Sequence, residues 1–151
     1  MELIVFNFLN GDYAIKLNKI KVILVYSQIK ITPLFDEKPW VSGVMNLRGE
    51  VSPIIDLRIR FSDVEPEFTE DTVVIVVKTN EDKLIGIIVD RIKSIQEVSG
   101  YVMSTPPDLA VGIHSKYISG LIKNGPNKMI TLLDIDKILE ILELTGESSN
   151  Y

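Results

Sequence analysis

The chain contains an internal repeat, because one pattern of short apolar segments and turns occurs twice along it. An apolar segment at residues 3–8 is followed by a polar turn at 10–12 and by a second apolar segment at 13–17. The same arrangement returns at 73–77, 80–82 and 84–89. Two strand-like apolar segments on either side of a short turn predict a β-hairpin. The sequence therefore predicts two related hairpins, one in each half of the chain.

The correspondence between the two halves extends beyond these hairpins. Residues 18–23 (NKIKVI) correspond to 90–95 (DRIKSI), residues 43–45 (GVM) to 120–122 (GLI), and residues 54–57 (IIDL) to 132–135 (LLDI). The matching segments occur in the same order in both halves, and the spacings between them change only slightly. We therefore predict two halves of the same topology, joined within residues 59–72.

The predicted fold class is mainly β. Each half offers about five short strands, and strands of this length and spacing favour a small closed barrel or a sandwich. We place the first barrel in approximately residues 1–62 and the second in 63–133, and the sequence leaves open whether strands are exchanged between them. One helix is predicted at residues 134–145, followed by a tail at 146–151. Its apolar positions share one face, and Asp134 can cap its first turn.

Composition narrows the classes of function. The absence of cysteine excludes disulfides and cysteine nucleophiles. A net charge of −5 and a pI near 4.9 argue against a nucleic-acid-binding surface. A mean hydropathy of +0.21 with 46% hydrophobic residues indicates either an unusually full core or apolar surface that partners cover.

Two further segments bear on compartment and organisation. The chain opens on an apolar, strand-like run, and no apolar run is long enough to span a membrane. We therefore expect a soluble cytoplasmic protein. The acidic run within residues 63–71 is predicted to be a solvated connector between the halves.

The sequence offers little chemistry of the kind that an enzyme requires. His114 is the single histidine, and it lies in a predicted loop, where a solvated side chain is the ordinary role. No glycine-rich phosphate-binding loop of the common spacings is present. Asp134 and Asp136 lie at the start of the predicted helix, where capping accounts for them without a metal. We therefore predict no catalytic residue, no metal site and no cofactor.

Residues 43–58 (GVMNLRGEVSPIIDLR) predict a second kind of hairpin, whose polar turn displays a cation. Arg48 lies in this turn beside Gly49, where its guanidinium can bind a carboxylate or backbone carbonyls of a partner, although an ordinary exposed arginine is the alternative. Asp56 and Arg58 follow the second strand and are predicted to form a structural ion pair at the rim of the barrel. Trp40 is expected to be a half-buried wedge, with interface anchoring as the alternative.

The same segment, and above all its NLRG and DLR motifs, resembles the signature of the CheW family, the non-enzymatic coupling proteins of bacterial chemotaxis. The resemblance continues in residues 72–77 (TVVIVV), 86–90 (GIIVD), 117–121 (YISGL) and 133–139 (LDIDKIL), so that it covers nearly the whole chain. It implies a single CheW-like domain over residues 1–151, built from two small five-stranded β-barrels of the Src-homology-3 type.

The resemblance also implies a function and partners. Members of the family bind the regulatory domain of the histidine kinase CheA and the cytoplasmic tip of chemoreceptors, the methyl-accepting chemotaxis proteins. A member would therefore be an adaptor rather than an enzyme and would need no cofactor. It would bind no nucleic acid, insert into no membrane, and reach membrane receptor arrays from the cytoplasm through its partners.

Several residues match positions to which the family assigns a role. The resemblance associates coupling to receptor and kinase with Arg48, Gly43, Val22 and Leu24. It associates the lining of a receptor groove between the barrels with Val74, Gly86 and Ile95. Leu24 is a departure, because the family commonly has an acidic residue at this position, and the receptor assignment near Val22 is weakened accordingly.

Two other classes of function remain as alternatives. A carboxylate-dependent hydrolase or lyase would require Asp56, Asp90 and Asp134 to converge, whereas the repeat places Asp56 and Asp134 at equivalent ends of separate barrels. A barrel that binds single-stranded nucleic acid is disfavoured by the acidic charge and by an aromatic content of 7%.

Overall fold

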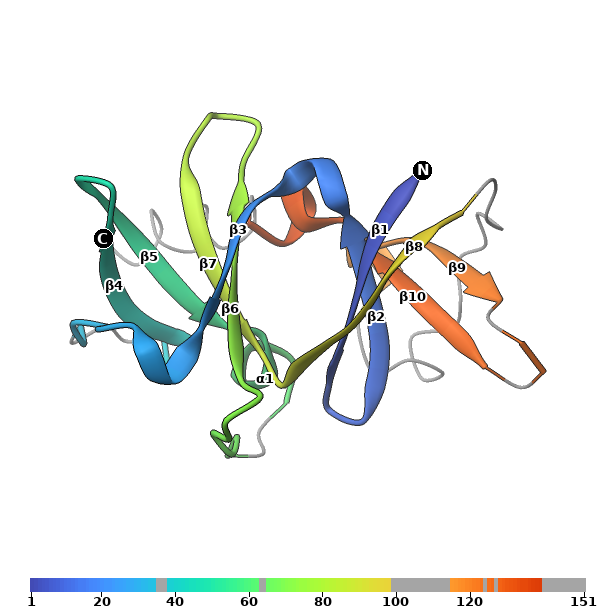
Figure 1. Cartoon of the computed structure of the whole chain (residues 1–151), viewed down its shortest axis with the longest axis horizontal. Coiled ribbons are helices and arrows are strands. Elements are labelled where there is room, and N and C mark those ends of the chain that lie inside the picture. Colours follow the sequence, from blue (N-terminus) through green and yellow to red (C-terminus); the bar gives the residue numbers. More distant parts are fainter. Residues whose placement is uncertain (35–37, 63–64, 99–114, 124, 127, 140–151) are drawn as a thin grey trace.

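The protein is mainly β, as its sequence predicts. The computed structural model describes residues 1–34, 38–62, 65–98, 115–123, 125–126 and 128–139, and within them ten strands form two five-stranded sheets. The first sheet contains β1 (Glu2–Phe8), β2 (Gly11–Lys16), β8 (Arg91–Glu97), β9 (Ile118–Lys123) and β10 (Met129–Leu133). The second contains β3 (Ile20–Val25), β4 (Val41–Leu47), β5 (Glu50–Asp56), β6 (Val73–Lys78) and β7 (Leu84–Val89). The sheets lie side by side, with β3 and β8 on the face shown in Figure 1.

The two related hairpins are exchanged between the halves of the chain. The strand orders are β8-β1-β2-β10-β9 and β3-β6-β7-β5-β4. Hairpin β1–β2 therefore joins strands of the second half, and hairpin β6–β7 joins strands of the first half. The inserted hairpins meet their hosts through parallel pairs, β2 with β10 and β7 with β5. Membership of the sheets thus differs from the approximate ranges 1–62 and 63–133. Because both halves offer equivalent strands, local sequence does not specify which half a hairpin joins.

Apolar side chains form three cores, one between the two sheets and one on the outer face of each sheet. The central core lies between the sheets and takes side chains from both. A first-sheet core and a second-sheet core lie on the outer faces. In β6, for example, Ile75 and Val77 face the central core, whereas Val74 and Val76 face the second-sheet core. Hairpins β1–β2 and β6–β7 are therefore buried on both faces, which explains their nearly continuous apolar sequences and much of the high mean hydropathy.

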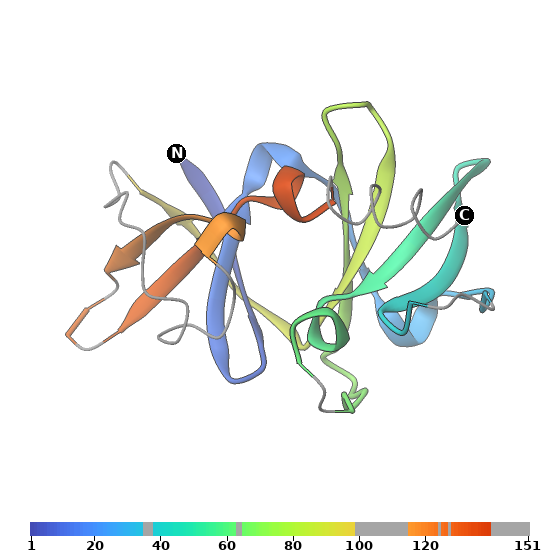
Figure 2. The ribbon, with the colours of Figure 1, turned by 180° about the vertical axis from the view of Figure 1, so that it is seen from behind.

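Short helices connect the strands. They are the 3-10 turns η1 (Leu17–Lys19), η2 (Tyr26–Gln28) and η3 (Ser115–Tyr117), and the helix α1 (Leu57–Phe61). Helix α1 was not predicted, because five residues are too few to display a helical apolar period. Figure 2 shows α1 and η3 on the face opposite to β3 and β8.

The predicted C-terminal helix begins where its sequence indicates. Residues 135–139 are helical, and the Asp134 carboxylate accepts a hydrogen bond from the Lys137 backbone N–H at 3.1 Å. The side chains of Ile135, Ile138 and Leu139 are buried in the central core. The remainder of the predicted helix and the tail lie in residues 140–151, outside the described residues. None of the helices within the described ranges is long and apolar enough to cross a bilayer.

Hairpin exchange makes each half dependent on the other for a complete sheet. We expect fragments 1–62 and 63–151 to lack a cooperative unfolding transition when they are separate, and to regain one when they are mixed. A piece of about 60 residues buries only about 60% of its surface even when it folds compactly. Thermal unfolding followed by circular dichroism tests this expectation. A cooperative transition in either isolated fragment would contradict it.

Candidate functional site

The hairpin β4–β5 displays Arg48 at its tip. Arg48 and Gly49 have positive φ angles of 54° and 81°, the backbone geometry required at the two central positions of a type I′ turn. The Asn46 carboxamide oxygen accepts the Gly49 N–H at 2.9 Å and steadies this turn. Within the described part of the chain, no hydrogen bond or ion pair occupies the exposed Arg48 guanidinium. The turn therefore presents a cation that is available to a partner.

Gly43 is buried beneath a crossing segment of backbone. Its φ angle is +149°, and an added Cβ would lie 2.2 Å from the Thr32 carbonyl oxygen. Thr32 and Val44 exchange backbone hydrogen bonds at 2.8 Å and 2.9 Å at the same crossing. Gly43 therefore allows two backbone segments to approach closely, and this packing role accounts for a glycine at the position.

Four of the predicted site residues gather on one face of the second sheet. Val22 pairs with Val76 and Leu24 with Val74, so the side chains of Val22, Leu24 and Val74 share the second-sheet core. A Cβ on Gly86 would lie 2.7 Å from Val74 Cγ1, which places Gly86 against the same core. Val74 is fully buried, and Leu24 packs as an apolar side chain among these neighbours.

Ile95 lies apart from this group, on the edge strand β8 of the first sheet, and its side chain is 61% exposed. It pairs with Ile4, a member of the central core, so Ile95 lies on the sheet face that is directed toward the other sheet. On the edge strand β3, Ile23 and Val25 are 36% and 39% exposed. Ile23 pairs with Ile75, another member of the central core. We call Ile23, Val25 and Ile95 the apolar rim, because they continue the central core outward along two edge strands.

Sequence reasoning did not single out Ile23 or Val25, although a signal was present. The repeat aligns Ile23 with Ile95, and both strands shift register at equivalent positions, near Lys21 in β3 and Lys93 in β8. Such bulges turn the residues beyond them onto the opposite face of the sheet. A register shift of one residue is not visible in apolar periodicity when both faces of a strand are apolar, as they are in β3.

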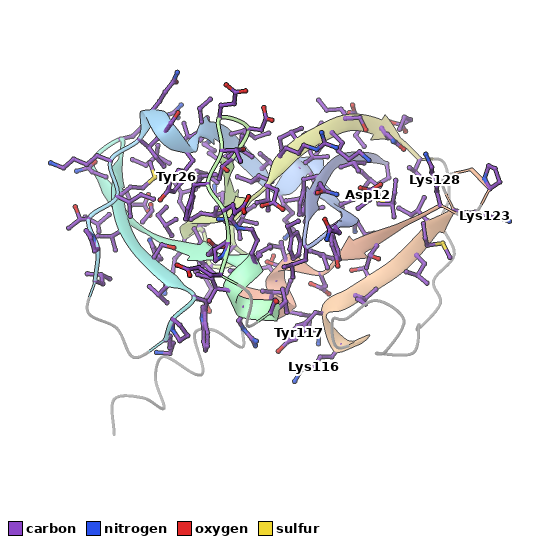
Figure 3. The ribbon with its side chains drawn as sticks, turned by 90° about the horizontal axis from the view of Figure 1, so that it is seen from below. Asp12, Tyr26, Lys116, Tyr117, Lys123 and Lys128 are labelled. Carbon is purple, nitrogen blue, oxygen red and sulfur yellow. The ribbon has the colours of Figure 1, made fainter. Side chains whose placement is uncertain are left out.

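The edge strand β8 is tied to the β1–β2 turn by an ion pair. Lys93 Nζ lies 3.0 Å and 3.1 Å from the two carboxylate oxygens of Asp12, and the Asn7 amide donates to the same carboxylate at 3.2 Å. Partial burial acts to raise the pKa of Asp12, but the hydrogen bonds from Lys93 and Asn7 outweigh it and lower that pKa. Figure 3 shows Asp12 on the β1–β2 hairpin of the first sheet. The contact thus positions β8 as long as Asp12 is ionised.

Asp56 and Arg58 form an ion pair that is buried rather than placed at an open rim. The side chains are 0% and 2% exposed, and Arg58 donates to the two Asp56 oxygens from Nε and Nη2, each at 2.9 Å. Arg58 Nη1 reaches Asp90 Oδ1 at 2.8 Å. Burial acts to lower the pKa of Arg58, but the hydrogen bonds to Asp56 and Asp90 raise it above its usual value. Arg58 therefore pairs with two carboxylates at once.

The acidic connector is anchored by the same arginine. Arg58 Nη1 donates to the Glu67 carbonyl oxygen at 2.6 Å, and the guanidinium lies 4.7 Å from the centre of the Phe68 ring. Phe68 also stacks on Tyr26 at 4.5 Å between ring centres. The carboxylate side chains of the connector are exposed from Glu65 onward, as a solvated connector would require, but its backbone is held by Arg58 at Glu67.

These contacts do not assemble the three aspartates into one reactive site. Asp56 and Asp90 bind opposite sides of the Arg58 guanidinium, whereas Asp134 caps the helix at residues 135–139. Among the residues that the structure describes, no three His, Cys, Asp or Glu side chains form a group able to hold a metal ion. His114 lies outside the described residues.

Comparisons with known proteins find similar sequences over nearly the whole chain. A family model described as a CheW-like domain matches residues 2–143. The chemotaxis protein CheW of Klebsiella aerogenes is 33% identical over 143 residues, which span 95% of this chain and 84% of that protein. The protein of the same name from Treponema pallidum is 32% identical over 146 residues, with coverages of 95% and 84%.

A solved structure has the same fold. The crystal structure of the scaffolding protein TtCheW from Thermoanaerobacter tengcongensis matches with a TM-score of 0.77. The match covers 89% of this chain and 84% of that protein. The sequence identity is 23%, so this likeness supports the fold alone.

The geometry at Gly43 predicts a structural rather than a contact role. We expect Gly43→Ala to lower the free energy of unfolding by about 3 kcal/mol or more, because the Thr32 backbone must move as well as Gly43 itself. Gly49→Ala is the matched control, since Gly49 also has a positive φ but an added Cβ would meet nothing within 4 Å. We expect that control to cost about 1–2 kcal/mol. Urea denaturation measures both, and equal losses would contradict the packing role.

Proposed function

The chain belongs to the CheW-like domain family, and from that membership we propose that it couples chemoreceptors to the histidine kinase CheA as a non-enzymatic chemotaxis adaptor. The observation that carries this proposal is a family match that extends over nearly the whole chain. An adaptor changes the activity of its partners by holding them in fixed positions, and it requires binding surfaces rather than reactive groups. We further propose that it works in the cytoplasm and joins membrane receptor arrays through these partners.

For the receptor side, we propose that the apolar rim receives the helical cytoplasmic tip of a chemoreceptor. Ile23, Val25 and Ile95 lie on edge strands of different sheets and face the space between them. An amphipathic helix presents an apolar stripe that can cover side chains on both edges at once. Val22, Leu24, Val74 and Gly86 contribute indirectly in this proposal, because their packing in the second-sheet core positions β3.

For the kinase side, we propose that Arg48 contacts the regulatory domain of CheA. Its guanidinium is exposed at the tip of a two-residue turn, where it can form a two-pronged hydrogen bond to a carboxylate or to backbone carbonyls. Arg48 lies on the β4–β5 hairpin, at the edge of the second sheet opposite to β3. The apolar rim borders the space between the two sheets. Separate surfaces allow the two partners to be bound at the same time.

Substitution Ile95→Glu tests the receptor surface. We expect binding of a receptor-tip fragment to weaken by about tenfold or more, corresponding to about 1.4 kcal/mol, because a carboxylate would lose water on docking. Val51→Glu is the matched control, since Val51 is a 66% exposed apolar residue on β5, outside the rim. Isothermal titration calorimetry measures both affinities. Unchanged binding by Ile95→Glu would remove the rim from the receptor site.

Substitution Arg48→Glu tests the kinase surface. We expect receptor-dependent control of CheA activity to fall in a reconstituted array, while the free energy of unfolding changes by no more than about 0.5 kcal/mol because the side chain is exposed. The control is Lys83→Glu, which makes the same change of charge on an exposed residue of the β6–β7 turn. Full receptor-dependent control by the Arg48→Glu protein would exclude this role for Arg48.

A further inference from the structure

Two aromatic residues occupy equivalent places in the two halves of the repeat. Trp40 precedes β4, and Tyr117 ends η3 immediately before β9. The Trp40 carbonyl oxygen accepts the Asp56 N–H at 2.8 Å, and the Tyr117 carbonyl oxygen accepts the Asp134 N–H at the same distance. Asp56 and Asp134 are themselves equivalent in the repeat. Each aromatic residue is thus fixed by the same backbone bond to its own half of the molecule.

One guanidinium lies against both of these rings. Arg60, in α1, donates from Nη2 to the Tyr117 hydroxyl at 3.0 Å. Its Cζ atom lies 5.1 Å from the centre of the Trp40 ring and 5.7 Å from that of Tyr117, within cation–π range of both. Phe61 supplies a third ring at 5.4 Å. We call Trp40, Arg60, Phe61 and Tyr117 the cation–aromatic box.

The position of Arg60 is unfavourable for folding in one respect. The Arg60 Nε atom and the Trp40 Nε1 atom are buried, and no hydrogen-bond acceptor reaches either of them from the residues that the structure describes. Two unpaired buried donors oppose folding, and an apolar side chain at position 60 would avoid one of them. The contacts of the guanidinium are directional, however, because one hydrogen bond and two ring contacts fix its orientation relative to both halves. Apolar contacts in the central core lack such direction, because hydrophobic attraction depends on buried area rather than on orientation.

The box lies on the opposite face of the molecule from the apolar rim. Figure 2 shows α1 and η3 on the face away from β3 and β8. Figure 3 places Tyr117 on the side of the molecule that carries α1, with the edge strands of the rim along the other side. A fixed contact between the two sheets on one face limits how far β3 and β8 can separate on the other face.

We propose that Arg60 is a positioning residue, which fixes the angle between the two sheets and thereby the spacing of β3 and β8 where a receptor helix docks. The role of Arg60 in the spacing is independent of the function proposed above. Its effect on docking rests on that proposed function. Loss of the Arg60 contacts lets the sheets sample a wider range of angles around the central core. A smaller fraction of molecules then has the spacing that fits the helix.

Distances between spin labels test the spacing directly, because the natural chain contains no cysteine. Labels are attached to Ile23→Cys and Ile95→Cys, equivalent exposed positions on the two edge strands. We expect Arg60→Gln to broaden the distance distribution or shift it by about 1–2 Å relative to the doubly labelled parent. Lys123→Gln, which removes the same charge from the far end of β9, is the matched control and should leave the distribution unchanged.

Milder variants keep the test valid if Arg60→Gln unfolds. Arg60→Lys retains the charge without the planar fork, and Tyr117→Phe removes only the hydroxyl that accepts from Arg60. We expect both to broaden the distribution less than Arg60→Gln does, with a melting temperature near that of the parent. Distributions that superpose on the parent in all three variants would overturn the inference.

A binding measurement then separates this inference from the function on which its second part rests. We expect receptor-tip affinity of the unlabelled Arg60→Gln protein to fall by about threefold to tenfold, in proportion to the fraction of molecules with the fitting spacing. A changed distance distribution with undiminished affinity would overturn the docking part. Absence of binding by the parent itself would instead overturn the proposed receptor surface and leave the role of Arg60 in spacing intact.

Discussion

The central core between the two sheets is the constraint on which the rest of this structure depends. It draws Phe6 and Phe8 from one exchanged hairpin and Ile75 and Ile87 from the other, all of them fully buried. Each such side chain contributes roughly 1.5–3 kcal/mol on burial. Because the strands that supply this core also supply an outer core, they must be apolar on both faces. Much of the hydrophobic content of the chain is therefore buried inside the molecule, and the edges β3 and β8 carry part of the remainder at the surface as the apolar rim.

Hairpin exchange brings the carboxylates of Asp56 and Asp90 close together, and the guanidinium of Arg58 lies between them. Strands β5 and β7 are parallel neighbours, and Asp56 and Asp90 lie at or just beyond their corresponding ends. Two carboxylates at adjacent strand ends repel each other unless a cation lies between them. Arg58 supplies that cation from the first turn of α1, and its remaining donor binds the connector at Glu67. The DLR segment thus joins three parts of the chain, which explains why this charged pair lies in the interior rather than in solvent.

These two features leave distinct surfaces for partners. The turn at Arg48 is tight and charged, whereas the rim at Ile23, Val25 and Ile95 is apolar and divided between two sheets. A surface divided in this way depends on how the sheets are oriented, and the cation–aromatic box around Arg60 lies where it can govern that orientation. An adaptor of this kind works through the spacing of its surfaces, and contacts far from either partner can alter what it binds.

The sequence by itself determined the mainly β class, the duplication, the exposed Arg48 turn and the start of the C-terminal helix, because each depends on local periodicity, a turn signature or a cap. It also indicated the Asp56–Arg58 pair, whose members are only two residues apart. Tertiary structure decided which half each hairpin joins, since equivalent strands compete equally for it. It also decided the bulges that place Ile23 beside the central core, the backbone crossing that requires Gly43, and the meeting of Trp40 with Tyr117 across Arg60. All of these depend on contacts between residues far apart in the chain, and no local pattern of residues encodes such contacts.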